Sequence, residues 1–158
     1  MIYIYSLGRA ARYYGERIAL SVSGKRLTFR ELHDRVERIA ADLNRRGLRT
    51  GDRLAILLPN GPEYIELVYA CSRLGVIAVP VNPRYSPREI DRVLKDASPG
   101  GLVRRSGPAP FTAKPAWQLL LDEESLDAPN GSCPEVYYSP EAILIMSTQA
   151  ALLASRRA

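Results

Sequence analysis

The stretch GLRTGDRLAILLPN, residues 47–60, is the strongest single indication of the fold. Gly51 and Asp52 form a tight turn, and five aliphatic residues follow without interruption over 54–58. A continuous apolar run of this kind is typical of a strand that is buried on both faces, as in a parallel sheet. The stretch therefore predicts a turn that leads into a buried strand.

A second apolar run, VIAVPV at residues 76–81, predicts another buried strand. Between the two runs lies a helical segment that ends at Gly75. Residues 60–63 (NGPE) are expected to start this helix, with Asn60 as the cap and Glu63 as the third helical residue. A strand, a helix and a second strand in this order predict a right-handed βαβ unit.

Two capping boxes mark further helix starts. Thr28 and Glu31 form the first, and the following helix is expected to end at Gly47. Ser86 and Glu89 form the second, with proline at the favoured first helical position. The remaining expected elements are a helix at 6–14, a hairpin of strands at 18–22 and 26–28, a strand from 101, a loop at 104–116, an edge strand at 117–121 and a last buried strand at 142–145.

Composition sets broad limits on function. The chain has 158 residues, 46% hydrophobic and 25% charged, with a net charge of +5, as in a soluble globular domain. Basic residues alternate with acidic ones along helices, which argues against nucleic-acid binding. No apolar run approaches the ~20 residues of a membrane span, and residues 1–5 are not expected to belong to a signal peptide. Cys71 is expected to be buried, Cys133 shows no metal-ligand spacing, and a cytoplasmic location is expected.

Three linked stretches resemble the adenylate-forming, or AMP-binding, acyl-CoA synthetase and ligase family. Residues 27–32 (LTFREL) resemble its L-T-Y-x-E-L pattern. Residues 47–60 resemble G-x-x-x-G-D-R-V-A-I-L-L-P-N, and residues 70–83 (ACSRLGVIAVPVNP) resemble A-x-x-K-L-G-A-V-x-V-P-L-N-P. Each stretch is weak alone, but their order and spacing together are specific.

The resemblance implies an α/β fold with a doubly wound, mostly parallel sheet, here as an incomplete N-terminal subdomain. We expect residues 1–105 to form that partial subdomain, 106–141 a loop-rich segment, and 142–158 a last strand with a tail unlike the family. The family activates a carboxylic acid with ATP and Mg²⁺ and passes the acyl group to coenzyme A, for example in fatty acid metabolism. Its phosphate loop and other catalytic groups lie further along the chain. The resemblance therefore transfers no catalytic, cofactor-binding or metal-binding residue to these 158 residues, and no cofactor is expected on them.

The tail MSTQAALLASRRA, residues 146–158, stands where the family has the phosphate loop Y-T-S-G-T-T-G-x-P-K-G. Read one base out of register, the codons of Ser147 to Ala158 can spell Y-T-S-G-T-T-G-L-P-K-G. A frameshift that truncates the family sequence is the leading hypothesis. A divergent natural C-terminus and a coincidence of composition are the alternatives, and the coding DNA would distinguish them.

Other chemistry-bearing residues have simpler structural interpretations. His33 flanks an apolar helical stripe and is expected at a boundary or surface. The run Asp122, Glu123 and Glu124 is more typical of a solvated loop than of a metal site. Three tyrosines are expected in packing rather than in a stacking platform: Tyr64, Tyr69 and Tyr85.

Two other classes of function stay open. A non-catalytic α/β module, or half of a split enzyme, would bind a partner instead of turning over substrate. A flavodoxin-like or Rossmann-like nucleotide domain is disfavoured because no glycine-rich loop follows a strand. For the fragment itself we expect self-association through an uncovered sheet edge, because strands that are apolar on both faces need cover on both.

Overall fold

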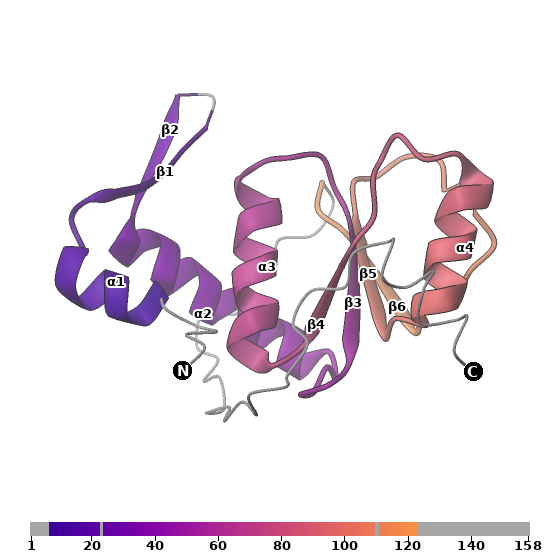
Figure 1. Cartoon of the computed structure of the whole chain (residues 1–158), viewed down its shortest axis with the longest axis horizontal. Coiled ribbons are helices and arrows are strands. Elements are labelled where there is room, and N and C mark those ends of the chain that lie inside the picture. The colour runs from indigo at the N-terminus through magenta and orange to yellow at the C-terminus, as the bar shows by residue number, and fades with distance from the viewer. Residues whose placement is uncertain (1–6, 23, 110, 123–158) are drawn as a thin grey trace.

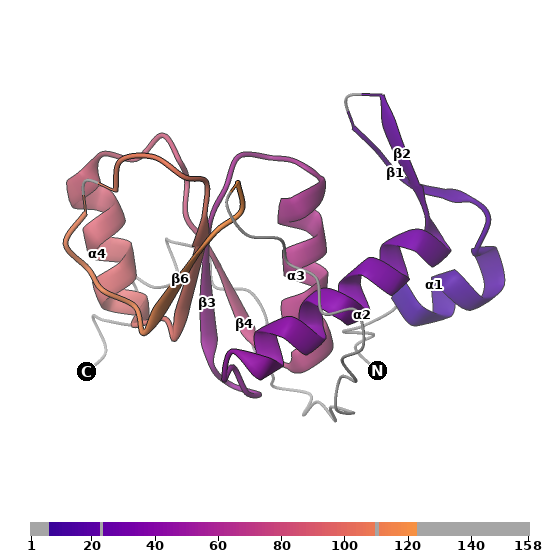
Figure 2. The same cartoon turned by 180° about the vertical axis from the view of Figure 1, so that it is seen from behind.

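The computed structural model describes residues 7–22, 24–109 and 111–122, and these residues form two parts joined by a long helix (Figure 1). The N-terminal lobe consists of helix α1 (Leu7–Tyr14) and a hairpin of strands β1 (Ile18–Val22) and β2 (Lys25–Thr28). Helix α2 (Phe29–Arg45) leads from this lobe to the sheet. The hairpin extends away from the rest of the molecule in both views (Figures 1 and 2).

The second part is a parallel sheet with helices on both faces. Its strands lie in the order β4, β3, β5, β6, and every neighbouring pair is parallel. The elements of this part are β3 (Arg53–Leu57), α3 (Pro62–Leu74), β4 (Ile77–Pro80), α4 (Pro87–Ala97), β5 (Gly101–Arg104) and β6 (Trp117–Leu120). The predicted doubly wound, mostly parallel α/β fold is confirmed, and the hairpin is the antiparallel exception.

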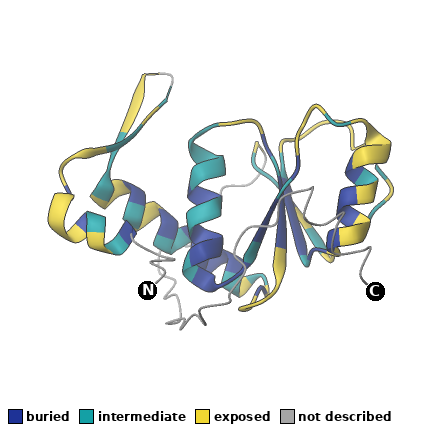
Figure 3. Ribbon diagram, in the orientation of Figure 1, coloured by how far each residue is buried: buried dark blue, intermediate teal, exposed yellow. Residues whose placement is uncertain are grey.

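The two faces of β3 explain its uninterrupted apolar sequence. Leu54 and Ile56 point into a core cluster that α2 and α3 help to form. Ala55 belongs to a second cluster on the other face, where α4 packs with Ile90 and Leu94. Burial is therefore concentrated along the sheet and its covering helices (Figure 3).

Both predicted capping boxes are formed. The Glu31 backbone N–H donates to Thr28 Oγ1 at 3.2 Å, and the Thr28 N–H donates to Glu31 Oε2 at 2.8 Å. The Ser86 N–H likewise donates to Glu89 Oε2 at 2.8 Å, and Pro87 begins α4. These reciprocal bonds satisfy amide groups that a helix start otherwise leaves without partners.

The expected cap of α3 is wrong. Gly61, not Asn60, is the N-cap residue, so Glu63 is the second helical residue and not the third, and no side chain makes a cap hydrogen bond there. Pro62 at the first helical position has no N–H to satisfy and a φ angle already suited to a helix, so the start needs less help from a side chain. The expected end is correct, since Gly75 closes α3 in the left-handed conformation with φ of 70°.

Ion pairs fix α2 against α3. The Glu66 carboxylate is buried and accepts two hydrogen bonds from the Arg35 guanidinium, at 2.8 and 3.2 Å. Arg73 donates to Glu37 at 2.8 Å across the same interface. A buried carboxylate has to be paired, so this contact fixes how the two helices lie against each other.

β6 lies inside the segment that we expect to be loop-rich, and it pairs with β5 as the edge strand of the described sheet. The expected strand at 142–145, the tail at 146–158 and Cys133 lie outside the described residues. Cys71 is buried as expected, and that burial raises the pKa of its thiol to about 12. Among the described helices, none is long and apolar enough to cross a membrane.

Candidate functional site

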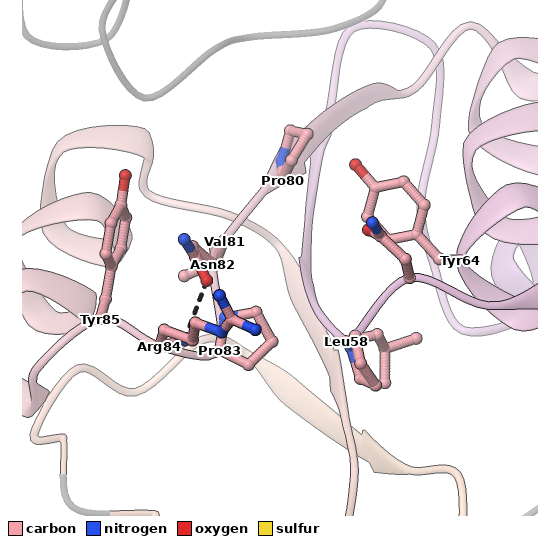
Figure 4. A pocket seen from close by; sticks show the side chains of 10 residues that line it. Leu58, Tyr64, Pro80, Val81, Asn82, Pro83, Arg84 and Tyr85 are labelled. Atoms are coloured by element: carbon pink, nitrogen blue, oxygen red, sulfur yellow. Dashed lines mark hydrogen bonds between the residues drawn. The ribbon is translucent and has the colours of Figure 1, made fainter.

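A hollow of about 580 Å³ lies where β3 and β4 end, at the carboxyl edge of the parallel sheet. Ligands of open α/β folds bind at this edge, so it is the candidate site within the described residues. Polar side chains and prolines share the lining (Figure 4). The lining residues are Leu58, Pro59, Asn60, Tyr64, Pro80, Val81, Asn82, Pro83, Arg84 and Tyr85.

The wall that follows β4 is a tight turn with its own hydrogen bonds. The Arg84 N–H donates to Asn82 Oδ1 at 2.9 Å, and the Tyr85 N–H donates to the Asn82 carbonyl at 3.0 Å. Pro83 restricts the backbone between them. The turn places Arg84 and Tyr85 beside the hollow at the start of α4.

The opposite wall follows β3. Asn60 lies in the exposed connection, and Tyr64 lies in the first turns of α3, half-buried. Partial burial raises the pKa of the Tyr64 hydroxyl above its ordinary value, so the phenol stays protonated at neutral pH and is able to donate a hydrogen bond.

Among the described residues, the lining supplies two amides, two phenols and one guanidinium, and none of them is a carboxylate, histidine, cysteine, serine or threonine. Such a set can hold a polar or anionic ligand by hydrogen bonds. It offers no nucleophile and no general base that works near neutral pH.

Two of the stretches that carry the family resemblance, residues 47–60 and 70–83, reach the hollow at their ends and also meet at the other end of the strands. The Gly51 N–H donates to the Gly75 carbonyl at 2.9 Å, and the Thr50 hydroxyl donates to the Leu74 carbonyl at 3.0 Å. Asp52 closes the turn by accepting from the Arg49 N–H at 2.7 Å. These contacts join the start of β3 to the end of α3, so the matching residues shape the fold.

The residues singled out from the sequence are scattered. His33 lies on α2, 28% exposed, with its Nδ1 atom 4.0 Å from a Glu37 carboxylate oxygen. Asp122 lies in an exposed loop and accepts a hydrogen bond from the Ser106 N–H at 2.9 Å. This bond, together with the Ser106 hydroxyl and the Arg105 charge, lowers the pKa of the Asp122 carboxyl. Glu123 and Glu124 lie outside the described residues. In the part of the chain that is described, no group of three or more His, Cys, Asp or Glu side chains could hold a metal ion.

The three tyrosines are divided between packing and the hollow. Tyr69 packs against the α2–α3 core as expected. Tyr64 and Tyr85 pack against the two cores and also line the hollow. Sequence reasoning missed this pairing because the two residues come from different βα connections, and only the parallel order of β3 and β4 places both at one edge.

A parallel sheet with helices on both faces and a polar hollow at its carboxyl edge defines an open α/β domain. The sequence matches the AMP-binding enzyme family over residues 7–144. The chain is 36% identical over 130 residues to feruloyl-CoA synthase of an Amycolatopsis species. That alignment covers 81% of this chain and 26% of the synthase. It is 37% identical over 95 residues to long-chain-fatty-acid–CoA ligase of Salmonella typhimurium, covering 60% of this chain and 17% of that enzyme.

A solved structure agrees with these relatives. O-succinylbenzoate coenzyme A synthetase of Bacillus subtilis, in complex with ATP and magnesium ion, superimposes with a TM-score of 0.72 at 32% identity. The alignment covers 83% of this chain and 35% of that one. The chain belongs to the AMP-binding enzyme family, and it spans about a quarter of the length of the feruloyl-CoA synthase that it matches.

Proposed function

We propose that these 158 residues are the N-terminal α/β part of an acyl-CoA synthetase. The reaction of the whole enzyme would be the ATP-dependent activation of a carboxylic acid to an acyl-adenylate, followed by transfer of the acyl group to coenzyme A. The observation that carries the proposal is the family match across residues 7–144, with two CoA-ligating enzymes among the relatives. A cytoplasmic location suits this reaction.

ATP, Mg²⁺ and coenzyme A are proposed as cofactors and substrates of the whole enzyme and not of these residues alone. Adenylation needs donors and cations arranged around the triphosphate, because negative charge develops there in the transition state. The described lining of the hollow at the ends of β3 and β4 brings one guanidinium, that of Arg84, and no carboxylate that could hold magnesium by its charge. The described residues therefore contribute a scaffold and a polar wall, and we assign them no catalytic or metal-binding residue.

The test is carboxylate-dependent pyrophosphate exchange by the purified 158-residue chain, with the Amycolatopsis feruloyl-CoA synthase as the positive control. Loss of one preorganised donor commonly lowers a rate by ~10²–10³, so exchange by the isolated chain should equal the background. Exchange above background would show that these residues carry the chemistry themselves.

A second measurement tests whether the chain is a working part of a ligase. The chain would be co-expressed with a feruloyl-CoA synthase that lacks its own matching N-terminal part. Recovered ligase activity supports the proposal and also fits half of a split enzyme. A folded chain that binds a partner without restoring activity supports the alternative, a non-catalytic α/β module.

We also propose that the 158-residue chain associates with itself through an uncovered sheet edge. Both β1 and β2 have only each other as strand partners among the described residues, and the larger sheet ends in β4 and β6. Unpaired backbone groups along such edges accept strands from other chains.

A further inference from the structure

The order of the strands marks a second place at the carboxyl edge of the sheet. β3 connects through α3 to β4 on one side, and the chain then returns through α4 to β5 on the other side of β3. α3 and α4 pack in the core clusters on opposite faces of the sheet (Figures 1 and 2). The direction of winding therefore reverses between β3 and β5. In open α/β sheets, ligands bind outside the carboxyl ends of the strands at such a reversal.

A pocket of about 290 Å³ lies at this reversal, and we call it the β3–β5 pocket. Leu57 at the end of β3 and Arg104 at the end of β5 are register partners, and both line it. The pocket adjoins the polar hollow, with which it shares Pro59, Pro83 and Tyr85. The two cavities therefore differ in the strand that completes them, which is β5 for the pocket and β4 for the hollow.

The lining of the β3–β5 pocket is mainly apolar. Ile90 of α4 and Phe111 of the connection between β5 and β6 line it, together with Leu57, Tyr85 and four prolines. Phe111, Leu57 and Tyr85 also pack against the core cluster to which Ile90 belongs, so the pocket is continuous with that core. Aromatic and proline rings present flat apolar surfaces, so this lining suits a ligand with a flat apolar body.

Arg104 gives the pocket a preference for negative charge. Its half-buried guanidinium donates to the Gln118 side-chain oxygen at 3.1 Å and to two backbone carbonyls of the following loop, at 2.9 and 3.0 Å. All of these acceptors are neutral. Arg105, by contrast, pairs with Asp122 at 2.9 Å and with Glu63 at 3.4 Å. Among the described residues, Arg104 has hydrogen-bond partners but no carboxylate, so an anion in the pocket would balance its charge.

The wall that contains Phe111 is held in place from α4. Asp91 accepts hydrogen bonds from the Thr112 and Ala113 N–H groups at 2.6 and 2.7 Å, and from the Thr112 hydroxyl at 3.0 Å. These residues directly follow Phe111 in the chain. Hydrogen bonds to a charged carboxylate are among the stronger ones in proteins. The wall is therefore fixed by contacts within the described residues.

From these observations we propose that the β3–β5 pocket binds a small organic anion with a flat apolar body, and that Arg104 pairs with its anionic group. The volume of about 290 Å³ is at the small end of ligand pockets, so a body of one or two rings fits it. The proposal goes beyond the ligase reaction proposed above, because binding at this pocket needs neither ATP nor turnover.

The experiment compares two probes that share a ring system and differ in charge, 2-naphthoate and its neutral analogue 2-naphthamide. Isothermal titration calorimetry measures the binding of each to the 158-residue chain, without ATP or coenzyme A. The naphthoate should bind about tenfold more tightly, because hydrogen bonds from a guanidinium to a carboxylate are charge-assisted. Amide NMR signals of Leu57, Ile90 and Phe111 should shift with both probes.

Arg104→Gln removes the charge from the pocket and should bring the two affinities to within about twofold of each other. Arg104→Lys keeps the charge and should keep a preference for the naphthoate. Arg84→Gln is the matched control, because it removes the same charge from the neighbouring hollow, and the ratio of the two affinities should stay as in the parent chain. A partly unfolded variant would weaken both probes alike, so the ratio reports on charge and not on folding.

A second pair of variants tests the apolar wall. Phe111→Ala should weaken both probes at least about fivefold without changing their ratio, because the ring loses its contact surface. Tyr13→Ala removes an aromatic ring that is exposed on the N-terminal lobe, and it should change neither affinity by more than about twofold.

Failure of both probes to bind would overturn the pocket as a ligand site. Equal affinities in the parent chain, or a preference that survives in Arg104→Gln, would overturn the role of Arg104. A preference that is lost in Arg84→Gln, with NMR shifts around the hollow, would place the anion there instead and overturn the assignment. None of these results depends on adenylation, which the pyrophosphate exchange tests separately.

Discussion

The N-terminal lobe and the four-stranded sheet obtain their structure in different ways. Every strand of the sheet contributes fully buried residues, and helices pack on both faces. In the hairpin neither β1 nor β2 contains a buried residue, and the lobe is anchored by Leu7 and Ala11 of α1. We therefore expect most of the stability to come from packing around the sheet, whereas the hairpin of the lobe is mainly exposed or half-buried (Figure 3).

The largest expected effect comes from deleting a core side chain in the sheet. Leu54→Ala removes a fully buried side chain from β3 and should lower the free energy of unfolding by roughly 2–5 kcal/mol. Leu20→Ala in β1 is the matched change at a half-buried position, and it should cost about 1 kcal/mol or less. Urea denaturation followed by circular dichroism measures both. Equal costs would mean that the lobe is as tightly packed as the sheet.

A glycine pair gives a second comparison. A Cβ atom at Gly101 of β5 would lie 2.3 Å from a Trp117 ring carbon, and Arg46 stacks over that ring with 5.6 Å to its centroid. Gly101→Ala should therefore cost about 1–3 kcal/mol through overpacking.

The matched hairpin change is Gly24→Ala, where no atom lies within 4 Å and the cost of about 1 kcal/mol comes from the positive φ of 80°. Thermal melts of both variants test the order. A larger loss at Gly24 would show that turn geometry, and not packing against Trp117, sets the tolerance for a side chain.

One ion pair with a buried carboxylate and one exposed ion pair allow the same comparison between the sheet and the lobe. Arg35→Ala leaves the buried Glu66 carboxylate without its partner. Because Arg35 is itself 45% exposed, water compensates in part, and a loss of about 1–2 kcal/mol is expected. Arg30→Ala breaks an exposed pair with Glu16 at the lobe and should change stability by less than about 0.5 kcal/mol.

The control for the first change is Arg35→Ala combined with Glu66→Gln, which removes the buried charge as well. The double variant should recover part of the loss, because a neutral amide is less costly to bury than an unpaired carboxylate. If the double variant is less stable than Arg35→Ala, the carboxylate is held by contacts other than the Arg35 pair.

The same contrast separates what the sequence could predict from what it could not. The hairpin, both capping boxes and the buried strand at β3 depend on neighbours in the chain, so short stretches of sequence suffice to predict them, as at Thr28 and Ser86 for the two boxes. The burial of Glu66 depends on how α2 crosses α3, and no local pattern marks that carboxylate as buried. The hollow likewise combines Tyr64 and Tyr85 through the order of the strands. The cap of α3 was mispredicted because asparagine is a frequent cap, while the geometry that Pro62 favours decided the start.

The smallest expected effect is the pH dependence that the two capping boxes contribute, one at the end of the lobe and one beside the sheet. The Thr28 N–H and then the Thr28 hydroxyl lower the pKa of Glu31 from its ordinary value of 4.5, and the Ser86 hydroxyl and then the Ser86 N–H do the same for Glu89. A carboxyl whose pKa is lower in the folded state binds protons more readily when unfolded. Each box therefore stabilises the fold fully above pH 4.5, and this contribution is lost as the pH falls through the lowered pKa.

Glutamine at the same position keeps the reciprocal hydrogen bond of a capping box but does not titrate. Glu31→Gln and Glu89→Gln should each make the loss of stability below pH 4.5 less steep, with little change at neutral pH. Urea midpoints measured across the acid range test this for each box separately. Glu31 joins the lobe to α2, so its variant should change the acid response of the hairpin, whereas Glu89→Gln should change that of α4 and the sheet. Amide hydrogen exchange resolves the two regions, and an identical response in both would show that the lobe and the sheet unfold as one cooperative unit.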